Sequence, residues 1–126
     1  MPYKPEGYTS VAPYLVLTDA RRTMDFLATV FDAEELRIFE REDGSIMHAE
    51  MRIDDTVLML ADGTGDWPPA PATIHVYVPD IDGVFARAVE AGAEVLQEPT
   101  QKDDPDRRGG FRGPGGTGWW VGQQMG

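Results

Sequence analysis

Short blocks of apolar residues recur along the chain, and turn residues separate them at even intervals. Blocks rich in β-branched and aromatic residues predict four strands in the first half, over 11–17, 35–39, 46–53 and 57–60. Between the first two blocks, Asp19 precedes apolar residues at near-helical spacing from Met24 to Phe31, which predicts a capped helix. The first half therefore predicts the order strand, helix, strand, strand, strand.

The same order begins again after a linker over 63–71, which contains three prolines. A helix is predicted after Asp80, and strands are predicted over 73–78, 94–97, 107–111 and 118–121. Two local matches indicate a duplication, because 31–36 resembles 91–96 and 17–19 resembles 78–80 at offsets close to sixty residues. We predict an α+β fold in which two βαβββ modules, about 9–62 and about 72–124, form one domain over residues 1–126.

Strand alternation assigns side chains to the two faces of each predicted sheet. The apolar set should pack under the helices, and it consists of Leu15, Leu17, Ala49, Met51, Ile53, Ile74, Val76 and Val78. The opposite faces then carry Tyr14, Val16, His48, Glu50, Arg52, His75 and Tyr77. These second faces hold most of the side chains that could do chemistry.

Composition and charge narrow the possible functions. The chain has 126 residues and a formal net charge of −11, from 11 basic and 22 acidic residues. Such a charge repels phosphate backbones, so we do not expect a nucleic acid partner, whereas a cationic guest would be compatible. The chain has no cysteine, which excludes disulfide frameworks, zinc knuckles, iron–sulfur clusters and thiol nucleophiles.

Two further classes of function lack their sequence signals. Residues 113–116 are glycine-rich, but no Gly-Lys-Ser/Thr follows them, so we exclude a phosphate-binding P-loop. The only serines, Ser10 and Ser45, do not stand in a nucleophile-elbow sequence, which argues against a serine hydrolase. No segment is apolar for long enough to span a membrane or to act as a signal peptide, so we expect no membrane partner and a cytoplasmic location.

The order and spacing of eight segments resemble a known family. They are 13–17, 24–27, 31–34, 47–53, 58–62, 78–82, 91–93 and 109–120. From Ser10 onward the chain is similar to short members of the glyoxalase/bleomycin-resistance/extradiol-dioxygenase superfamily, also called the vicinal oxygen chelate superfamily. The resemblance implies curved mixed sheets around a cleft, helices on the convex faces and completion of the cleft by a homodimer. Some members hold a divalent metal ion there, and others trap an antibiotic without metal.

The resemblance also indicates where metal ligands would lie, on the first and last strands of each module. Those positions fall on Tyr14, Met59, His75 and Val121. A catalytic divalent ion needs about three nitrogen or oxygen ligands, and this set offers a single imidazole. We therefore expect no metal ion or other cofactor; the alternative is one divalent ion, which His75 would help to hold.

Several candidate residues have two interpretations. His48 with Glu50 two positions later could act as a general base, or the row could be a solvated face on which Glu50 and Arg52 pair across strands. His75 could contact a ligand or be a hydrogen-bonded core histidine. The family register places Trp119 toward the cleft, although a slip of one residue would exchange it with Trp120.

The arginines of the segment 107–112 also have two interpretations. Arg107, Arg108 and Arg112 could bind a carboxylate or phosphate of a ligand. Alternatively, they offset the charges of the nearby aspartates Asp103, Asp104 and Asp106.

We predict that the protein binds a small organic molecule, planar or cationic and antibiotic-like, in the cleft without metal. The expected contact residues are Tyr14, His48, Glu50, Met59, His75, Tyr77, Arg112 and Trp119. The alternatives are a divalent-metal lyase, isomerase or dioxygenase of the same fold, and a metal-free acid–base enzyme that uses His48 and Glu50. A third alternative is a dimeric interaction domain without a ligand, so whether the protein is an enzyme stays open.

Overall fold

The computed structural model describes residues 2–126, which form two four-stranded mixed sheets and two helices. The elements are β1 (Tyr14–Leu17), α1 (Ala20–Phe31), β2 (Glu34–Glu40), β3 (Ile46–Ile53), β4 (Thr56–Asp62), β5 (Thr73–Tyr77), α2 (Ile81–Glu90), β6 (Glu94–Gln101), β7 (Asp106–Arg112), the 3₁₀ turn η1 (Pro114–Gly116) and β8 (Gly118–Gln124). The strand orders are β1-β4-β3-β2 and β5-β8-β7-β6. In each sheet the first and last strands of the module are parallel neighbours. The predicted α+β fold with two βαβββ modules is confirmed.

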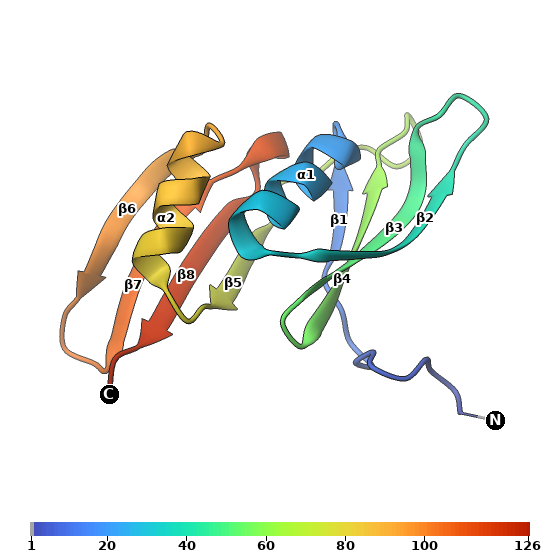
Figure 1. The fold of residues 1–126 in the computed structure, drawn as a ribbon. Helices are drawn as coiled ribbons and strands as arrows, with labels where there is room; N and C mark the ends of the chain where they lie inside the picture. The colour runs from blue at the N-terminus through green and yellow to red at the C-terminus, as the bar shows by residue number, and fades with distance from the viewer. Residues whose placement is uncertain (1) are drawn as a thin grey trace.

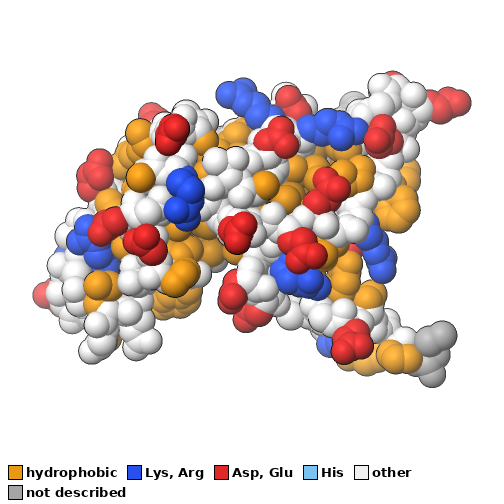
Figure 2. All heavy atoms as spheres, viewed as in Figure 1, with side chains coloured by type: hydrophobic (Ala, Val, Ile, Leu, Met, Phe, Trp, Pro, Cys, Tyr) orange, Lys and Arg blue, Asp and Glu red, His pale blue; other side chains and the backbone are white. Residues whose placement is uncertain are grey.

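The two sheets stand side by side, with β1 and β5 at their facing edges and both helices on the same side (Figure 1). The helices pack against each other as well as against their own sheets. They have 12 and 10 residues, and within residues 2–126 no helix is long and apolar enough to cross a membrane. On the face that carries the helices, acidic and basic side chains are scattered rather than gathered in one patch (Figure 2).

The two modules repeat the same way of anchoring a helix. Asp19 caps α1 and Asp80 caps α2, each accepting a hydrogen bond from the backbone N–H three residues later. Asp62 at the end of β4 accepts a hydrogen bond of 2.7 Å from the first N–H of α1. Gln123 near the end of β8 accepts the equivalent bond, of 2.9 Å, from the first N–H of α2. Both pairs of residues are 61 positions apart, so the duplication extends to individual hydrogen bonds.

The buried core lies between the helices and the sheets. The residues predicted to pack there from the first module are buried, namely Leu15, Leu17, Ala49, Met51 and Ile53. Those predicted from β5 and its end are partly buried against the same core, namely Ile74, Val76 and Val78. The alternation of apolar residues therefore predicted the helix-facing sides of the strands correctly.

The core is continuous from one module to the other. The ring of Phe31, at the end of α1, lies 5.4 Å from the ring of Trp119 and 6.0 Å from that of Phe111, both in the second sheet. Arg87 of α2 donates two hydrogen bonds, of 3.1 and 3.2 Å, to the carbonyl oxygen of Val30. The first helix therefore contributes to the packing of both sheets, and it leaves the opposite sheet faces without a helix.

Candidate functional site

A row of side chains crosses the first sheet on the face opposite the helices. Tyr14 of β1 and Glu50 of β3 are both direct register partners of Met59 in β4. Arg37 of β2 is in turn the partner of Glu50. Because direct partners on neighbouring strands point to the same side, these four side chains form one continuous surface.

Hydrogen bonds link this row into a chain. Nδ1 of His48 lies 3.0 Å from the Tyr14 hydroxyl, and Nε2 lies 2.7 Å from Oε2 of Glu50. Since the carboxylate accepts, Nε2 is the donor of that bond. In the neutral ring with its proton on Nε2, Nδ1 accepts from the Tyr14 hydroxyl. The other oxygen of Glu50 accepts a hydrogen bond of 2.5 Å from the hydroxyl of Tyr8 and lies 3.7 Å from Nε of Arg37.

Glu50 is a buried carboxylate on an otherwise open surface, with an exposed fraction of 4%. Burial acts to raise the pKa of Glu50, but the hydrogen bonds from Tyr8 and His48 and the charge of Arg37 outweigh it, so its pKa lies below the ordinary value. The hydrogen bond to Glu50 raises the pKa of the Tyr8 hydroxyl, and burial raises the pKa of the Tyr14 hydroxyl. At neutral pH the site therefore holds an ionised carboxylate and two protonated phenols.

Three aromatic rings lie near His48, two of them in direct contact with its ring and the third in contact with Tyr14. Tyr14 lies 5.6 Å from the His48 ring and 5.4 Å from the ring of Trp67, which belongs to the linker between the modules. Phe39 of β2 lies 6.3 Å from His48 on the other side. The exposed fractions of Tyr14, Phe39 and Trp67 are 41%, 49% and 44%. Partly exposed aromatic rings thus lie on both sides of His48.

The corresponding face of the second sheet carries His75, Tyr77 and Trp120. His75 of β5 is the register partner of Trp120 in β8, and its ring lies 4.7 Å from the ring of Tyr77. Two glycines make room for these rings. A Cβ atom on Gly110 would lie 2.5 Å from the Trp120 ring, and one on Gly122 would lie 3.2 Å from both His75 and Tyr77.

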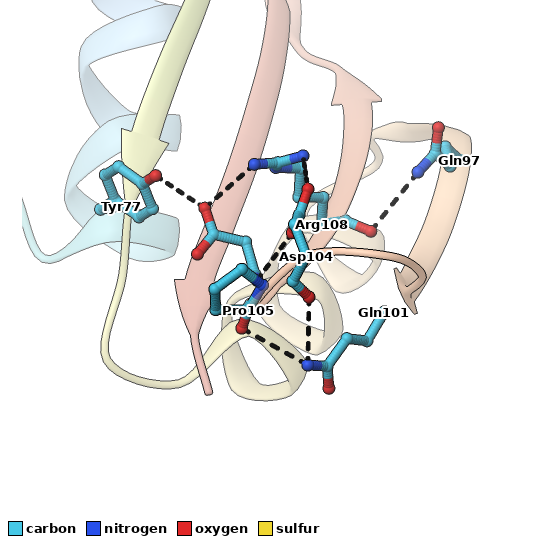
Figure 3. Close-up of polar contacts among 7 residues, drawn as sticks. Tyr77, Gln97, Gln101, Asp104, Pro105 and Arg108 are labelled. Atoms are coloured by element: carbon cyan, nitrogen blue, oxygen red, sulfur yellow. Dashed lines mark hydrogen bonds and ion pairs between the residues drawn. The ribbon is translucent and has the colours of Figure 1, made fainter. Parts of the chain in front are cut away.

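Charged residues on β7 hold Tyr77 in place (Figure 3). The Tyr77 hydroxyl donates a hydrogen bond of 2.7 Å to Asp106, which also accepts one of 3.2 Å from Arg108. The bond from Tyr77, together with Arg108, lowers the pKa of Asp106 although desolvation opposes this, and the same bond raises the pKa of Tyr77. Arg108 also bonds Asp104 at 2.6 Å, so this arginine offsets nearby aspartates.

Arg112 and Arg107 do not join the other predicted contact residues. Arg112 donates a hydrogen bond of 2.5 Å to Glu94, its register partner on β6, and borders a separate hollow of about 310 Å³ beside Arg22. Arg107 pairs with Asp82 of α2 at 2.9 Å. Both arginines therefore have carboxylate partners within the chain.

The prediction that Trp119 faces the cleft is wrong. Trp119 is fully buried among core residues on the helix side, and its neighbour Trp120 takes the open face. Val121 is buried with Trp119. The offset of 61 residues that relates Tyr14 to His75 also relates Met59 to Trp120, so the counterpart of Met59 is Trp120 and not Val121.

Four further residues of the first face, Tyr8, Arg37, Phe39 and Trp67, are not among the candidate site residues predicted from the sequence. Phe39 and Arg37 were predicted only as part of a strand, whereas Tyr8 and Trp67 lie in an arm and a linker that have no periodic pattern. The alternative for the row on β3, in which Glu50 and Arg52 pair across neighbouring strands, is confirmed in its pairing. Glu50 lies 3.7 Å from Arg37 of β2, and Arg52 lies 3.8 Å from Glu34 of the same strand.

The donors near His75 do not fit a divalent metal ion. On the same face, its neighbours are Tyr77, whose oxygen already bonds Asp106, and the ring of Trp120. Three or more His, Asp or Glu side chains suited to holding a metal ion do not come together anywhere in residues 2–126. Such an ion needs about three nitrogen or oxygen ligands, which these residues do not supply.

The two open faces do not touch within one chain. Across residues 2–126, no hydrogen bond, ion pair or ring contact joins Tyr14, His48 or Glu50 to His75 or Trp120. His75 borders a hollow of about 310 Å³ beside the turn between β3 and β4. A hollow of about 910 Å³ lies between the modules at Arg52 and Asp80. Because Tyr14, His48 and Glu50 do not line that hollow, we place the candidate site on the sheet face.

Comparisons with known proteins agree with this architecture. The family profile of the Glyoxalase/Bleomycin resistance protein/Dioxygenase superfamily matches residues 9–121. An uncharacterized protein of Mycobacterium bovis is 36% identical over an alignment of length 127. The alignment covers 92% of this chain and 84% of that protein. The crystal structure of TioX from Micromonospora sp. ML1 is similar with a TM-score of 0.77 and 24% identity, over 92% of this chain and 98% of TioX. TnmS3, an antibiotic binding protein from Streptomyces sp. CB03234, is similar with a TM-score of 0.70 and 20% identity, over 93% of this chain and 99% of TnmS3.

Proposed function

Because the chain belongs to the Glyoxalase/Bleomycin resistance protein/Dioxygenase superfamily, we propose that it binds a small planar organic molecule on the open face of its first sheet, without a resident metal ion. The observation that carries the proposal is the buried carboxylate of Glu50, bonded to His48, whose ring lies between the partly exposed rings of Tyr14 and Phe39. That TnmS3, a structure of the same fold, is an antibiotic binding protein supports an antibiotic-like guest.

The geometry favours binding of a flat molecule. Three large rings that are about half exposed and lie together on one face form an apolar surface of the kind that marks ligand sites. Stacking against Tyr14, Phe39 and Trp67 would supply most of the affinity. His48 and Glu50 would then fix the orientation of the guest through hydrogen bonds, and Met59 would form the floor between them.

A second copy of the chain would complete the site. The second open face, with His75, Tyr77 and Trp120, offers a matching aromatic surface that does not meet the first face within one chain. In our proposal, a homodimer places the second face of one protomer over the first face of its partner. The guest would be enclosed between two aromatic walls, and each dimer would hold two guests. We propose the cytoplasm as the compartment.

A second candidate function is acid–base catalysis without metal. The hydrogen-bonded chain from Tyr14 through His48 to Glu50 favours it, because a carboxylate on one imidazole nitrogen orients the ring. His48 would take a proton from a bound substrate at the nitrogen that now faces Tyr14, and Glu50 would stabilise the imidazolium.

Thermal-shift screening with planar aromatic antibiotics, followed by calorimetric titration, tests the binding proposal. Compounds that bind should raise the midpoint of unfolding in wild type, and Phe39→Ala and Trp120→Ala should weaken them at least about tenfold. Val89→Ala is the matched control, since Val89 is about half exposed, as Phe39 is, but lies on α2, on the helix side. Equal weakening by all three variants, or no binding by any planar compound, would contradict the proposal.

Metal analysis and kinetics separate the remaining candidates. Protein purified without chelators should contain no stoichiometric Ni, Zn, Fe or Mn, and a metal bound at one ion per chain would overturn the metal-free part of the proposal. For any substrate that the protein turns over, His48→Ala should abolish turnover while leaving affinity intact if acid–base catalysis is the function.

A further inference from the structure

An N-terminal arm, residues 2–13, lies against the candidate site through one side chain. The arm contains no helix or strand, and nearly all of its side chains from residue 2 to 11 are exposed. The hydroxyl of Tyr8 donates a hydrogen bond to Oε1 of Glu50 in β3. The other side-chain hydrogen bonds of residues 2–11 stay within the arm. The Tyr8 ring lies 5.6 Å from the guanidinium carbon of Arg37. The phenol of Tyr8 is thus held at both its hydroxyl and its ring face.

The position that the Tyr8 hydroxyl occupies requires a hydrogen-bond donor. The Glu50 carboxylate is almost entirely buried, and His48 already bonds its other oxygen. Oε1 therefore depends on Tyr8 for its short hydrogen bond, because Arg37 is farther away at 3.7 Å. A buried carboxylate oxygen that loses its donor is unfavourable, so any molecule that displaces Tyr8 must bring a donor of its own.

Arg37 decides which kind of donor fits. An ammonium group at Oε1 would come close to the guanidinium and be repelled, whereas a neutral hydroxyl would not. The guanidinium also favours an aromatic ring face, as its position over Tyr8 shows. Carboxylate and guanidinium together therefore select an aromatic ring that carries a hydroxyl group.

We propose that Glu50 and Arg37 form a subsite for a phenolic hydroxyl group, which Tyr8 fills when no ligand is bound and from which a phenolic ligand displaces it. This inference rests on the proposed function and names the ligand class of the same site, hydroxylated aromatic compounds. The arm then acts as a tethered competitor. While Tyr8 fills the subsite, the ligand cannot enter it, so the apparent affinity for the ligand falls in proportion to the fraction of time that Tyr8 is bound there.

Titration with a matched pair of probes tests this inference. The probes are 2-naphthol and 2-methoxynaphthalene, which share the ring system but differ in the hydrogen-bond donor. Tyr8→Ala should bind 2-naphthol at least about threefold more tightly than wild type, and it should bind the methoxy compound more weakly than the naphthol. Tyr3→Ala, which removes an exposed tyrosine of the same arm, should bind both probes as wild type does.

Two further variants keep the test decisive. Tyr8→Phe, which keeps the ring and loses the hydroxyl, should show a smaller gain than Tyr8→Ala. Adding Glu50→Gln to Tyr8→Ala should abolish the preference for the naphthol over the methoxy compound. In wild type, saturating 2-naphthol should narrow the amide NMR signal of Gly7, because the arm is released.

The outcomes distinguish this inference from the proposed function. Equal affinity of Tyr8→Ala for the two probes, or no gain over wild type, would overturn the phenol subsite. If planar antibiotics still bound and required Phe39 and Trp120, the proposed function would stand without it. Failure of every planar compound, naphthol included, to bind would overturn both.

Discussion

Nε2 of His48 lies 2.7 Å from Oε2 of Glu50, and the two residues are separated by one position on β3. Residues two apart on a strand share a face, so this pair is a direct product of strand geometry. Tyr14 from β1 and Tyr8 from the N-terminal arm extend it to a chain of four polar groups. An imidazole–carboxylate pair is therefore fixed in position before any ligand arrives.

The stability of the protein should depend on pH through Glu50. Its pKa is below the ordinary value in the folded state, so its contribution is complete above the ordinary pKa of a glutamate and is lost as pH falls through the lowered pKa. At pH 7, Glu50→Gln should lower the free energy of unfolding by about 1–3 kcal/mol, because a buried hydrogen-bonded charge is lost. Urea denaturation between about pH 6 and pH 3 should show a steeper decline for wild type than for the variant.

The control for this prediction is Glu34→Gln. Glu34 is exposed and lies 3.8 Å from Arg52, an arrangement that contributes little to stability. This variant should keep the unfolding free energy within about 0.5 kcal/mol of wild type and should keep its pH dependence. Parallel pH curves for wild type and Glu50→Gln would contradict the assignment of the acid sensitivity to Glu50.

The two adjacent tryptophans should respond to substitution in opposite ways. Trp119→Leu removes a fully buried ring from the core and should cost about 2–4 kcal/mol of unfolding free energy. Trp120→Leu alters the open face and should cost less than about 1 kcal/mol. Acrylamide should quench the fluorescence of Trp120 more strongly than that of Trp119 in the corresponding single variants. A larger loss of unfolding free energy in Trp120→Leu than in Trp119→Leu would contradict the burial of Trp119 in the core.

The adjacent glycines of β7 offer a second test of the same alternation. A Cβ on Gly109 would lie 2.5 Å from the ring of Phe85 and 2.8 Å from the backbone oxygen of Gln97, neither of which can move freely. Gly109→Ala should therefore cost about 1–3 kcal/mol of unfolding free energy. Gly110→Ala pushes instead on Trp120, which borders the open face and can shift, so it should cost less and change the tryptophan emission spectrum. Equal losses would contradict this arrangement.

The repeated helix anchors predict a graded effect. Asp62 bonds both the first N–H of α1 and the N–H of Ile46, each at 2.7 Å, whereas Gln123 bonds only the first N–H of α2. Asp62→Ala should lower the unfolding free energy by about 2–4 kcal/mol and Gln123→Ala by about 1–2 kcal/mol. Asp62→Asn keeps one acceptor oxygen and should fall between wild type and Asp62→Ala. An equal cost for the two alanine variants would show that the second bond of Asp62 adds nothing.

The sequence predicted the fold and one half of the candidate site because both follow from strand alternation. Apolar residues at every second position identified the buried faces, and the same rule brought Tyr14, His48 and Glu50 to the opposite face. The duplication was visible at Asp19 and Asp80, and the structure extends it to Asp62 and Gln123.

What the sequence did not predict depends on long-range contacts or on exact register. Tyr8 and Trp67 reach the site from segments without periodicity, so only the folded chain shows where they dock. The orientation of Trp119 required the register to one residue, and an error of one position reverses every side chain of a strand. Arg112 pairs with Glu94 across β6 and β7, a contact that requires knowledge of which residues of the two strands face each other.

Because the two modules share one core, cleavage of the chain between them should not separate the two halves. The Phe31 ring contacts Trp119, and Arg87 bonds the end of α1, so each half shields apolar surface of the other. Limited proteolysis within the linker 63–71 would leave two fragments that stay together as a noncovalent pair. Either fragment alone would expose large aromatic side chains to water and would aggregate.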